Sequence, residues 1–489
     1  EAFRISNRVI AKAAWQRFRQ TDDKVQLADL KWRPFQLAFI LLNLPGIIDE
    51  TDPHRETVDL LFFPTGGGKT EAYLGLAAFS MVLRRFRNPG VMGCGLSVLM
   101  RYTLRLLTLD QLGRAAGLMC ALELEREKDP RLGVWPFEIG LWVGSAATPN
   151  RMGGRKYTGP GREYTAYAKV NAFRSDTKKP SPIPLESCPW CGAKFDRNSF
   201  RLTPNQNEPT NLQIGCVNRA CDFSGDRALP ILTVDEPIYR RLPAFLIATV
   251  DKFAALPWEG RAGALLGHVQ RLDVHGFYGP VDQSKGKGFD GPLPGPDLII
   301  QDELHLISGP LGTIAGLYET AIENLASRQR GEAVVKPKIV ASTATVRRAD
   351  AQIQGLFGRH TSKVFPPPGP DLRDTFFSLT HSLEQSNGRL YLGVAAQGRS
   401  LKVILMRAGL ALLCAGKKLY DESGGKIAGN PADPYMTMLG YFNSLRELGG
   451  SRRIVEDEVV SRAAKYGQRS RLDPDVSYFS SRNVDYEPC

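Results

Sequence analysis

The segment 63–70, Phe-Pro-Thr-Gly-Gly-Gly-Lys-Thr, contains residue types that can bind a phosphate. Because Gly66, Gly67 and Gly68 carry no side chains, successive backbone N–H groups can point at one anion. Lys69 adds a positive charge for the β- and γ-phosphates of a nucleotide, and Thr70 offers a hydroxyl to Mg²⁺. A plain glycine turn would need neither Lys69 nor Thr70, so the pattern favours nucleotide binding over that alternative.

The residues on either side of this loop predict the elements that must position it. Residues 58–63 read as a short buried strand, and residues 71–85 read as a helix with apolar positions at helical spacing. A strand, a glycine loop and a helix in this order place the phosphate at a helix N-terminus, which favours an anion. One position departs from the usual pattern, because Phe63 occupies the place of its first glycine.

An acidic pair follows a later apolar strand, predicted at 297–300. The carboxyl end of a buried strand is where an α/β sheet places its reactive groups. We expect Asp302 to hold Mg²⁺ through water and Glu303 to polarise an attacking water. His305 either couples this site to the next motif or is a hydrogen-bonded structural histidine. An acidic surface turn is the alternative, and the upstream glycine loop argues against it.

A run of small hydroxyl residues, Ser342-Thr343-Ala344-Thr345, follows the strand predicted at 338–341. Its side chains can hydrogen-bond to the acidic loop beside it. They can also cap the N-terminus of a following helix, since Ser and Thr are good caps. The two roles are compatible.

Four of the eight cysteines form two close pairs, with C-x₂-C and C-x₄-C spacing. Four thiolates can close a tetrahedral Zn²⁺ site, and a polar insertion with little core of its own needs such a staple. The role is structural, because four cysteines leave no open coordination position; the alternative is reduced cysteines without a metal. The predicted zinc ligands are Cys188, Cys191, Cys216 and Cys221.

Composition narrows the class of protein and its partners. The chain has 489 residues and a formal net charge of +12, which favours a polyanionic partner, although a basic surface kept for solubility gives the same value. No apolar run reaches the ~18 residues of a membrane-spanning helix. Unclustered cysteines beside a nucleotide loop predict a reducing, cytoplasmic location. The start at Glu1, without Met or an apolar leader, suggests a trimmed chain.

Three of these segments, in this order, resemble motifs I, II and III of superfamily 2 DExH helicases. They are the loop at 63–70, the Asp-Glu-Leu-His box at 302–305 and the Thr-Ala-Thr at 343–345. The segment 33–36, Arg-Pro-Phe-Gln, resembles the segment that reads adenine in this family. Residues 101–111 and 249–253 resemble motifs Ia and Ib, which touch the nucleic-acid backbone.

The resemblance implies ATP and Mg²⁺ as cofactors and hydrolysis of ATP. The nucleotide contacts that it implies are Gln36, Thr65, Gly66, Gly67, Gly68, Lys69, Thr70, Asp302, Thr343 and Thr345, and the catalytic set is Lys69, Asp302, Glu303 and His305. It places Mg²⁺ on Thr70 and Asp302. It implies nucleic-acid contacts by Arg101, Arg105, Thr249 and Lys252.

Three phrases are similar to the DrmA family, the helicase-like subunits of DISARM anti-phage defence systems. They lie at 70–76, 99–108 and 440–448. This resemblance implies a bacterial cytoplasmic defence protein that binds DNA, single-stranded or with an overhang, and a DrmB-like partner subunit, and no membrane. The function expected is an ATP-dependent DNA helicase or translocase, and the alternative is an ATP-gated DNA-binding scaffold with little unwinding activity.

The fold expected is α/β, with a RecA-like P-loop NTPase lobe, a zinc-ribbon-like insertion and a second, incomplete RecA-like lobe. Arginine-rich motif VI and motif V are not recognisable after the proline linker at 366–370. The expected domains are an N-terminal helical segment at 1–50, the first lobe at 51–143 and 228–365, the four-cysteine zinc-binding insertion at 144–227 and the partial second lobe at 371–489. Within the last, a strand is expected at 389–394 and helices at 401–413 and 435–448.

Overall fold

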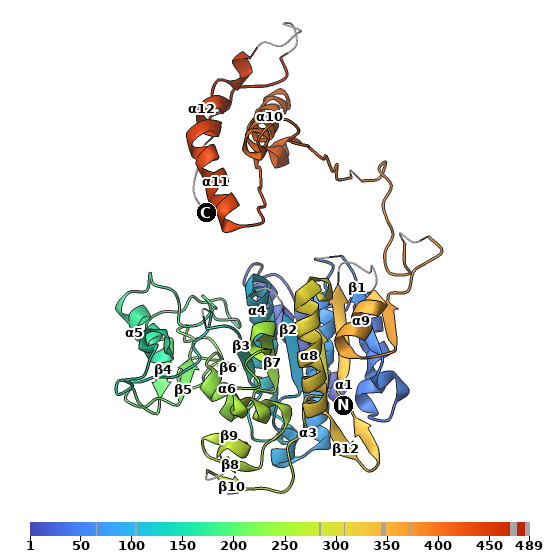
Figure 1. Ribbon diagram of the computed structural model, residues 1–489, viewed down its shortest axis with the longest axis vertical. Coiled ribbons are helices and arrows are strands. Elements are labelled where there is room, and N and C mark those ends of the chain that lie inside the picture. Colours follow the sequence, from blue (N-terminus) through green and yellow to red (C-terminus); the bar gives the residue numbers. More distant parts are fainter. Residues whose placement is uncertain are drawn as a thin grey trace. The chain divides into compact units, whose positions relative to one another are not determined.

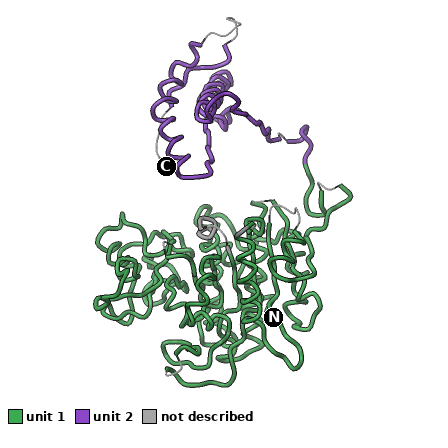
Figure 2. The backbone as a smooth tube through the Cα atoms, in the orientation of Figure 1, with its two compact units in different colours: residues 1–380 green, residues 381–489 purple. Residues whose placement is uncertain are grey.

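The structure is a computed structural model of residues 1–489. It describes the chain except residues 65, 103–104, 146, 283–284, 308, 344–348, 372–373, 387, 470–476 and 485–489, and the side chains of residues 102, 105–110 and 310 are also not described. Two compact units result, residues 1–380 and residues 381–489 (Figure 2). Each unit is described by itself.

The first unit is built on a parallel sheet of eight strands, in the order β15-β1-β14-β11-β2-β7-β3-β6 (Figure 1). Each neighbouring pair runs parallel. The mixed α/β class with a large parallel sheet is thus confirmed. The strands are β1 (Val58–Phe62), β2 (Val98–Tyr102), β3 (Ile139–Trp142), β6 (Ile231–Leu232), β7 (Phe245–Thr249), β11 (Leu298–Gln301), β14 (Lys338–Thr343) and β15 (Ser362–Phe365).

Two hydrophobic cores cover the two faces of this sheet, because alternate residues of a strand point to opposite faces. In β7, Phe245 and Ile247 belong to one core, and Leu246 and Ala248 belong to the other. The first core packs helices α1 (Ala2–Arg19), α2 (Pro34–Ile48), α3 (Lys69–Arg87) and α4 (Arg105–Arg126). The second packs α6 (Asp235–Arg241), α7 (Val250–Phe253), α8 (Gly309–Ala326) and α9 (Ala349–Phe357).

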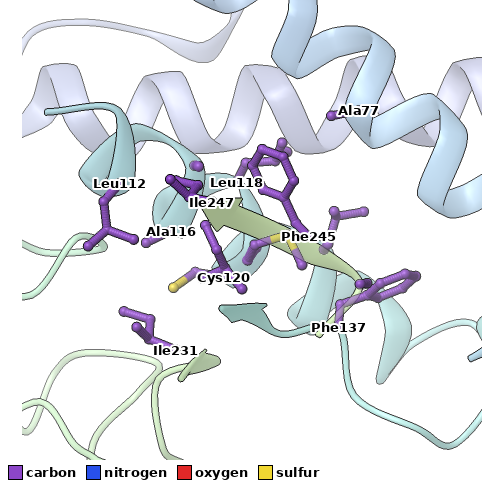
Figure 3. Close-up of a cluster of buried hydrophobic side chains, with 14 of the residues drawn as sticks. Ala77, Leu112, Ala116, Leu118, Cys120, Phe137, Ile231, Phe245 and Ile247 are labelled. Atoms are coloured by element: carbon purple, nitrogen blue, oxygen red, sulfur yellow. The ribbon is translucent and has the colours of Figure 1, made fainter. Parts of the chain in front are cut away.

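The first core is continuous from α3 across α4 to the sheet. Figure 3 shows Ala77 of α3, Ala116 and Cys120 of α4, and Phe245 and Ile247 of β7 gathered at this contact. All are buried, so α3 and the glycine loop that precedes it are held against the sheet by apolar packing. Burial of this kind contributes about 25 cal/mol for each Å² of apolar surface removed from water.

The segment 144–227 contains α5 (Ala166–Ser175) and the antiparallel pair β4 (Phe200–Thr203) and β5 (Asn211–Ile214). We expected this insertion to have little core. Instead Trp190, Phe200 and Phe223 are buried and join the first core of the sheet. The apolar positions were too widely spaced in the sequence for their convergence to be visible.

Smaller sheets complete the first unit. The antiparallel strands β8 (Arg271–Asp273), β9 (Gly276–Tyr278) and β10 (Lys287–Gly288) form one, and β12 (Arg328–Arg330) pairs with β13 (Ala333–Val335) in another. Across the described part of the chain, no helix has the length and apolar character needed to span a membrane.

In the described part of the second unit, the regular elements are helices. It contains α10 (Leu401–Glu422), α11 (Leu445–Ile454), a π-helical turn (Val455–Val459) and α12 (Val460–Ala463). The helix expected from 401 is confirmed. The strand expected at 389–394 is wrong, since these residues are irregular. The helix expected at 435–448 is also wrong over most of its length, because only a short 3₁₀ turn ending at Met436 and the start of α11 are helical there.

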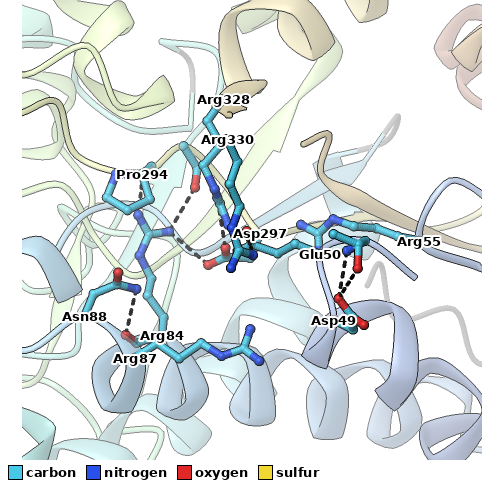
Figure 4. A network of polar contacts seen from close by, with 12 residues as sticks. Asp49, Glu50, Arg55, Arg84, Arg87, Asn88, Pro294, Asp297, Arg328 and Arg330 are labelled. Atoms are coloured by element: carbon cyan, nitrogen blue, oxygen red, sulfur yellow. Dashed lines mark hydrogen bonds and ion pairs between the residues drawn. The ribbon is translucent and has the colours of Figure 1, made fainter. Parts of the chain in front are cut away.

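A buried polar network lies where β11 begins. Arg84 donates to Asp297 Oδ2 at 3.1 Å and to Leu96 O at 2.8 Å, and Arg328 pairs with both Asp297 and Glu50 (Figure 4). Burial would raise the pKa of Asp297, but Arg84 and Arg328 lower it. The network therefore joins α3 and the start of β12 to Asp297, the residue just before β11.

Candidate functional site

The glycine loop forms a cradle between β1 and α3. Gly66 and Gly68 have φ values of +83° and +95°, which side-chain-bearing residues rarely adopt. A Cβ on Gly67 would lie 2.9 Å from both Phe63 Cδ1 and Pro64 O. The three glycines are thus required by backbone shape and by space, as the sequence pattern indicates. Thr65, also predicted as a nucleotide contact, lies outside the described residues.

Lys69 opens α3 and is only 7% exposed. Among the described residues, its Nζ atom has no hydrogen-bond partner. A buried ammonium without a partner is costly, and an anion placed on the glycine loop would relieve that cost. The residues present therefore fit a nucleotide phosphate.

Two side chains from the start of α2 hold the glycine loop. Arg33 donates to Gly67 O at 2.6 Å, and Gln36 Nε2 donates to Gly68 O at 2.8 Å. Gln36 Oε1 accepts from the Arg33 backbone N–H at 2.8 Å. In this conformation one end of the Gln36 amide braces the loop and the other end caps the start of α2. Its contact with adenine stays a prediction.

Phe63, which replaces the first glycine of the usual loop pattern, stacks on Phe35. The ring centroids lie 3.9 Å apart and the rings are tilted by 10°. Stacked aromatic side chains bury a large apolar surface against each other. The departure from the pattern thus has a structural reason, since it ties the loop to α2.

The acidic pair lies just after β11. Asp302 Oδ1 accepts from Ser342 Oγ and, at 3.0 Å, from the Glu303 backbone N–H. Glu303 has φ +47°, a left-handed conformation that is costly for a residue with a side chain and that clusters at functional sites. Since β11 pairs with β14 in parallel, the ends of both strands meet at this edge of the sheet.

His305 joins the acidic box to the hydroxyl run after β14. Its Nδ1 lies 3.2 Å from Thr343 Oγ1 and 3.3 Å from Glu303 Oε2. This geometry suits both interpretations of His305, as a coupling residue and as a hydrogen-bonded structural one. Its catalytic role stays a prediction, and Thr345 lies outside the described residues.

Thr70 lies within reach of two side chains that the sequence interpretation did not assign. Gln111 Nε2 of α4 donates to Thr70 Oγ1 at 3.1 Å. The Tyr73 hydroxyl lies 3.1 Å from Thr70 Oγ1 and donates to Asp302 Oδ2 at 2.9 Å. The spacing of three residues along α3 was the available signal for Tyr73, since such residues share a helix face.

The side chains predicted to contact nucleic acid are largely internal. Arg101 is 1% exposed and pairs with Glu319 of α8. Lys252 Nζ lies 2.5 Å from Asp235 Oδ2 and 3.0 Å from Asn150 Oδ1, and Thr249 is buried. In this conformation all three side chains are buried, and Arg101 and Lys252 are paired with internal carboxylates. Their contacts with nucleic acid stay predictions. The side chain of Arg105 lies outside the described residues.

The two cysteine pairs converge on one point. The Sγ atoms of Cys188, Cys191, Cys216 and Cys221 all lie within 4.8 Å of one another. Hydrogen bonding with Cys188 lowers the pKa of Cys221 to about 6, and the same contact, together with burial, raises the pKa of Cys188. Four converging sulfurs in a tight cluster fit a tetrahedral zinc site.

The parallel sheet places the chain in the class of α/β proteins. Its glycine loop, buried lysine, helical threonine and acidic pair follow the residue pattern of a phosphate-binding loop. Within that class, the chain is similar to the DISARM protein DrmA of Bacillus paralicheniformis, with 40% identity over 488 residues. The match covers 96% of this chain, and the chain spans 42% of the length of DrmA. The predicted resemblance to DrmA is confirmed. No protein-family model matches the chain.

Solved structures give a weaker likeness. A crystal structure of the DUF1998 helicase MrfA bound to DNA has a TM-score of 0.34 and 11% identity, over 72% of this chain and 27% of that chain. The same helicase bound to DNA and AMPPNP has a TM-score of 0.32 and 11% identity, over 72% and 28%. At TM-scores this low, the likeness carries no argument about this chain.

Proposed function

We propose that this chain provides the ATP site of a helicase- or translocase-like subunit of a bacterial anti-phage defence complex. The similarity to DrmA supports the defence role. The observation that carries the ATP site is the buried Nζ of Lys69 beside the glycine loop, which has no hydrogen-bond partner among the described residues.

In this proposal each residue has a separate task. The N–H groups at 66–68 bind the phosphates of ATP, and Lys69 neutralises their charge. Thr70 and Asp302 would hold Mg²⁺, which when bound stabilises charge on the phosphates. Glu303 would accept a proton from the attacking water, and its Oε2 lies 3.3 Å from His305 Nδ1.

We further propose that the cysteine cluster holds a structural Zn²⁺. The convergence of the four sulfurs within 4.8 Å supports this. The metal would fasten the segment 144–227 to the first core, where Cys188 and Trp190 are buried together. Four protein ligands leave no position for a substrate, so the site would not be catalytic.

DNA, single-stranded or with an overhang, and a DrmB-like subunit are the proposed partners. The net charge of +12 supports a polyanionic partner. Because Arg101 and Lys252 are internally paired, the DNA contacts must involve other side chains or a rearrangement of these pairs.

An ATPase assay with and without single-stranded, duplex and overhang DNA tests the proposal. Lys69→Ala and Glu303→Gln should each lower DNA-stimulated turnover by about 10²-fold or more. Lys363→Ala, on the exposed side of β15, removes a lysine from the same sheet and should leave turnover unchanged. Nucleotide and DNA binding without turnover would favour the scaffold alternative, and no binding of ATP would exclude both.

A further inference from the structure

The hydroxyl of Tyr73 lies between the two groups assigned to Mg²⁺. It is 3.1 Å from Thr70 Oγ1 and 2.9 Å from Asp302 Oδ2. The side chain is 1% exposed and belongs to the first core. It therefore reaches the site from a fixed position on α3 and not as a surface group that happens to fold inward.

The hydrogen atoms of this cluster can be assigned by counting donors and acceptors. An ionised carboxylate only accepts, so the one proton of Tyr73 is used on Asp302. The contact between Tyr73 and Thr70 then needs the proton of Thr70. Gln111 Nε2 donates to Thr70 Oγ1 and occupies one lone pair of that oxygen. One lone pair of Thr70 is left for a metal ion.

The other oxygen of Asp302 is held as well. Ser342 Oγ and the Glu303 backbone N–H both donate to Oδ1, so Tyr73 is what fixes Oδ2. A carboxylate oxygen has room for a second donor. A metal-bound water can therefore join Tyr73 on Oδ2 without displacing it.

We propose that Tyr73 is a positioning residue of the metal–nucleotide site. By taking the proton of Thr70 and giving its own to Asp302, its hydroxyl turns the free lone pair of Thr70 and the Oδ2 of Asp302 toward Mg²⁺. This inference rests on the proposed ATP site, and it adds that Mg²⁺ strengthens nucleotide binding through a tyrosine that does not itself touch the metal.

The test is ADP binding to the full chain, measured by calorimetry in Mg²⁺ and again in EDTA. Mg²⁺ should raise the affinity for ADP by a factor that is about tenfold smaller in Tyr73→Phe than in the wild type, because a hydrogen bond to a charged group is removed. ADP binding in EDTA should change by less than about twofold. A structural role alone would lower both affinities together.

Tyr239→Phe is the matched control, because Tyr239 is also buried and its hydroxyl accepts from Trp142 Nε1 at 3.0 Å, away from the glycine loop. It should keep the whole Mg²⁺ gain. When Thr70→Ala is already present, Tyr73→Phe should reduce the Mg²⁺-dependent gain in ADP affinity by less than it does in the wild type, because the effects of coupled residues are not additive.

A Tyr73→Phe protein that keeps the full Mg²⁺ gain, or that binds Mg²⁺-ADP more tightly than the wild type, overturns the role of Tyr73 and leaves the ATP site intact. A fully additive effect with Thr70→Ala overturns it too. A wild-type protein that binds no ADP in either condition overturns the proposed function itself.

Discussion

At the scale of single residues, Gly68 combines a positive φ with a close neighbour. Its φ is +95°, and a Cβ at this position would lie 2.8 Å from Gln36 Nε2. We expect Gly68→Ala to displace Gln36 and to weaken ADP binding by about tenfold or more. The left-handed backbone should in addition lower the free energy of unfolding by about 1–2 kcal/mol. Calorimetry with ADP and thermal unfolding measure the two effects.

Gly331→Ala is the control for this change. Gly331 has φ +61° between β12 and β13, and nothing lies within 4 Å of its Cβ position. It should lower stability by a similar amount and leave ADP binding unchanged. Equal loss of ADP binding in both variants would show that strain, and not the contact with Gln36, is responsible.

The buried pair of Asp235 and Lys252 predicts a dependence on pH. Burial raises the pKa of Asp235 to about 6, although Lys252 acts in the opposite direction. Between the ordinary pKa of 3.8 and about 6, the folded state binds more protons than the unfolded state, so stability falls as pH rises through this window. Above about 6 the contribution levels off.

Asp235→Asn removes this titration. We expect the free energy of unfolding of the wild type, minus that of the variant, to decrease from pH 4 to pH 6 and then to stay constant. Urea unfolding at several pH values measures it. A difference that grows with pH would mean that Lys252 holds the pKa of Asp235 below its ordinary value.

At the scale of elements, the cysteine cluster is fastened to the helices of the first core. Trp190, within the first cysteine pair, is buried. Its backbone carbonyl accepts from Gln20 Nε2 at 3.5 Å, and Lys12 Nζ lies 5.4 Å from its ring centroid. Removing the metal with a chelator should therefore lower the unfolding temperature of the whole first unit by about 5 °C, because the binding energy stabilises one shared core.

Calorimetric scanning with zinc quantification measures this effect, and Cys94→Ala controls for the loss of a buried thiol outside the cluster. That variant should keep its zinc. A separate low-temperature transition after chelation would show that the segment 144–227 unfolds independently of the sheet.

The starts of β1 and β14 are joined by a buried ion pair. Lys338 Nζ lies 2.6 Å from Asp59 Oδ2 and also donates to Thr57 O at 2.6 Å. Lys338→Met should cost about 3–5 kcal/mol, because it leaves Asp59 buried and unpaired. Replacing both residues, Lys338→Met with Asp59→Leu, should recover at least about half of that loss in urea unfolding. An equal loss in the single and double variants would contradict this.

The elements that carry the site could be predicted because their signals are local. Apolar runs followed by glycine, acidic or hydroxyl residues marked β1, β11 and β14, and the structure places these ends together. The partners of Arg101 and Lys252 could not be predicted in this way. Glu319 lies 218 residues from Arg101, and no local pattern connects them. The strand expected at 389–394 failed because an apolar run forms a strand only where a neighbouring strand is present to pair with it.

At the scale of the whole molecule, the described residues of the candidate ATP site all lie in the unit 1–380. We therefore expect a protein of residues 1–380 to bind ADP within about twofold of the affinity of the full chain, because every described residue assigned to the phosphates and to Mg²⁺ lies within it. Calorimetry on both proteins measures this. A loss of binding in the shorter protein, with its unfolding transition preserved, would show that the second unit contributes to the site.

The position of β1 in the sheet also bears on how the protein is made. β1 pairs only with β14 and β15 among the described strands, and these are synthesised about 280 residues later. At about 5–20 residues per second, a ribosome needs roughly 15–60 s to produce them. During that time an apolar strand and the glycine loop attached to it have no sheet to join. The nucleotide site is therefore among the last parts of the first unit to form, and β1 is the segment on which we expect a chaperone to act during synthesis.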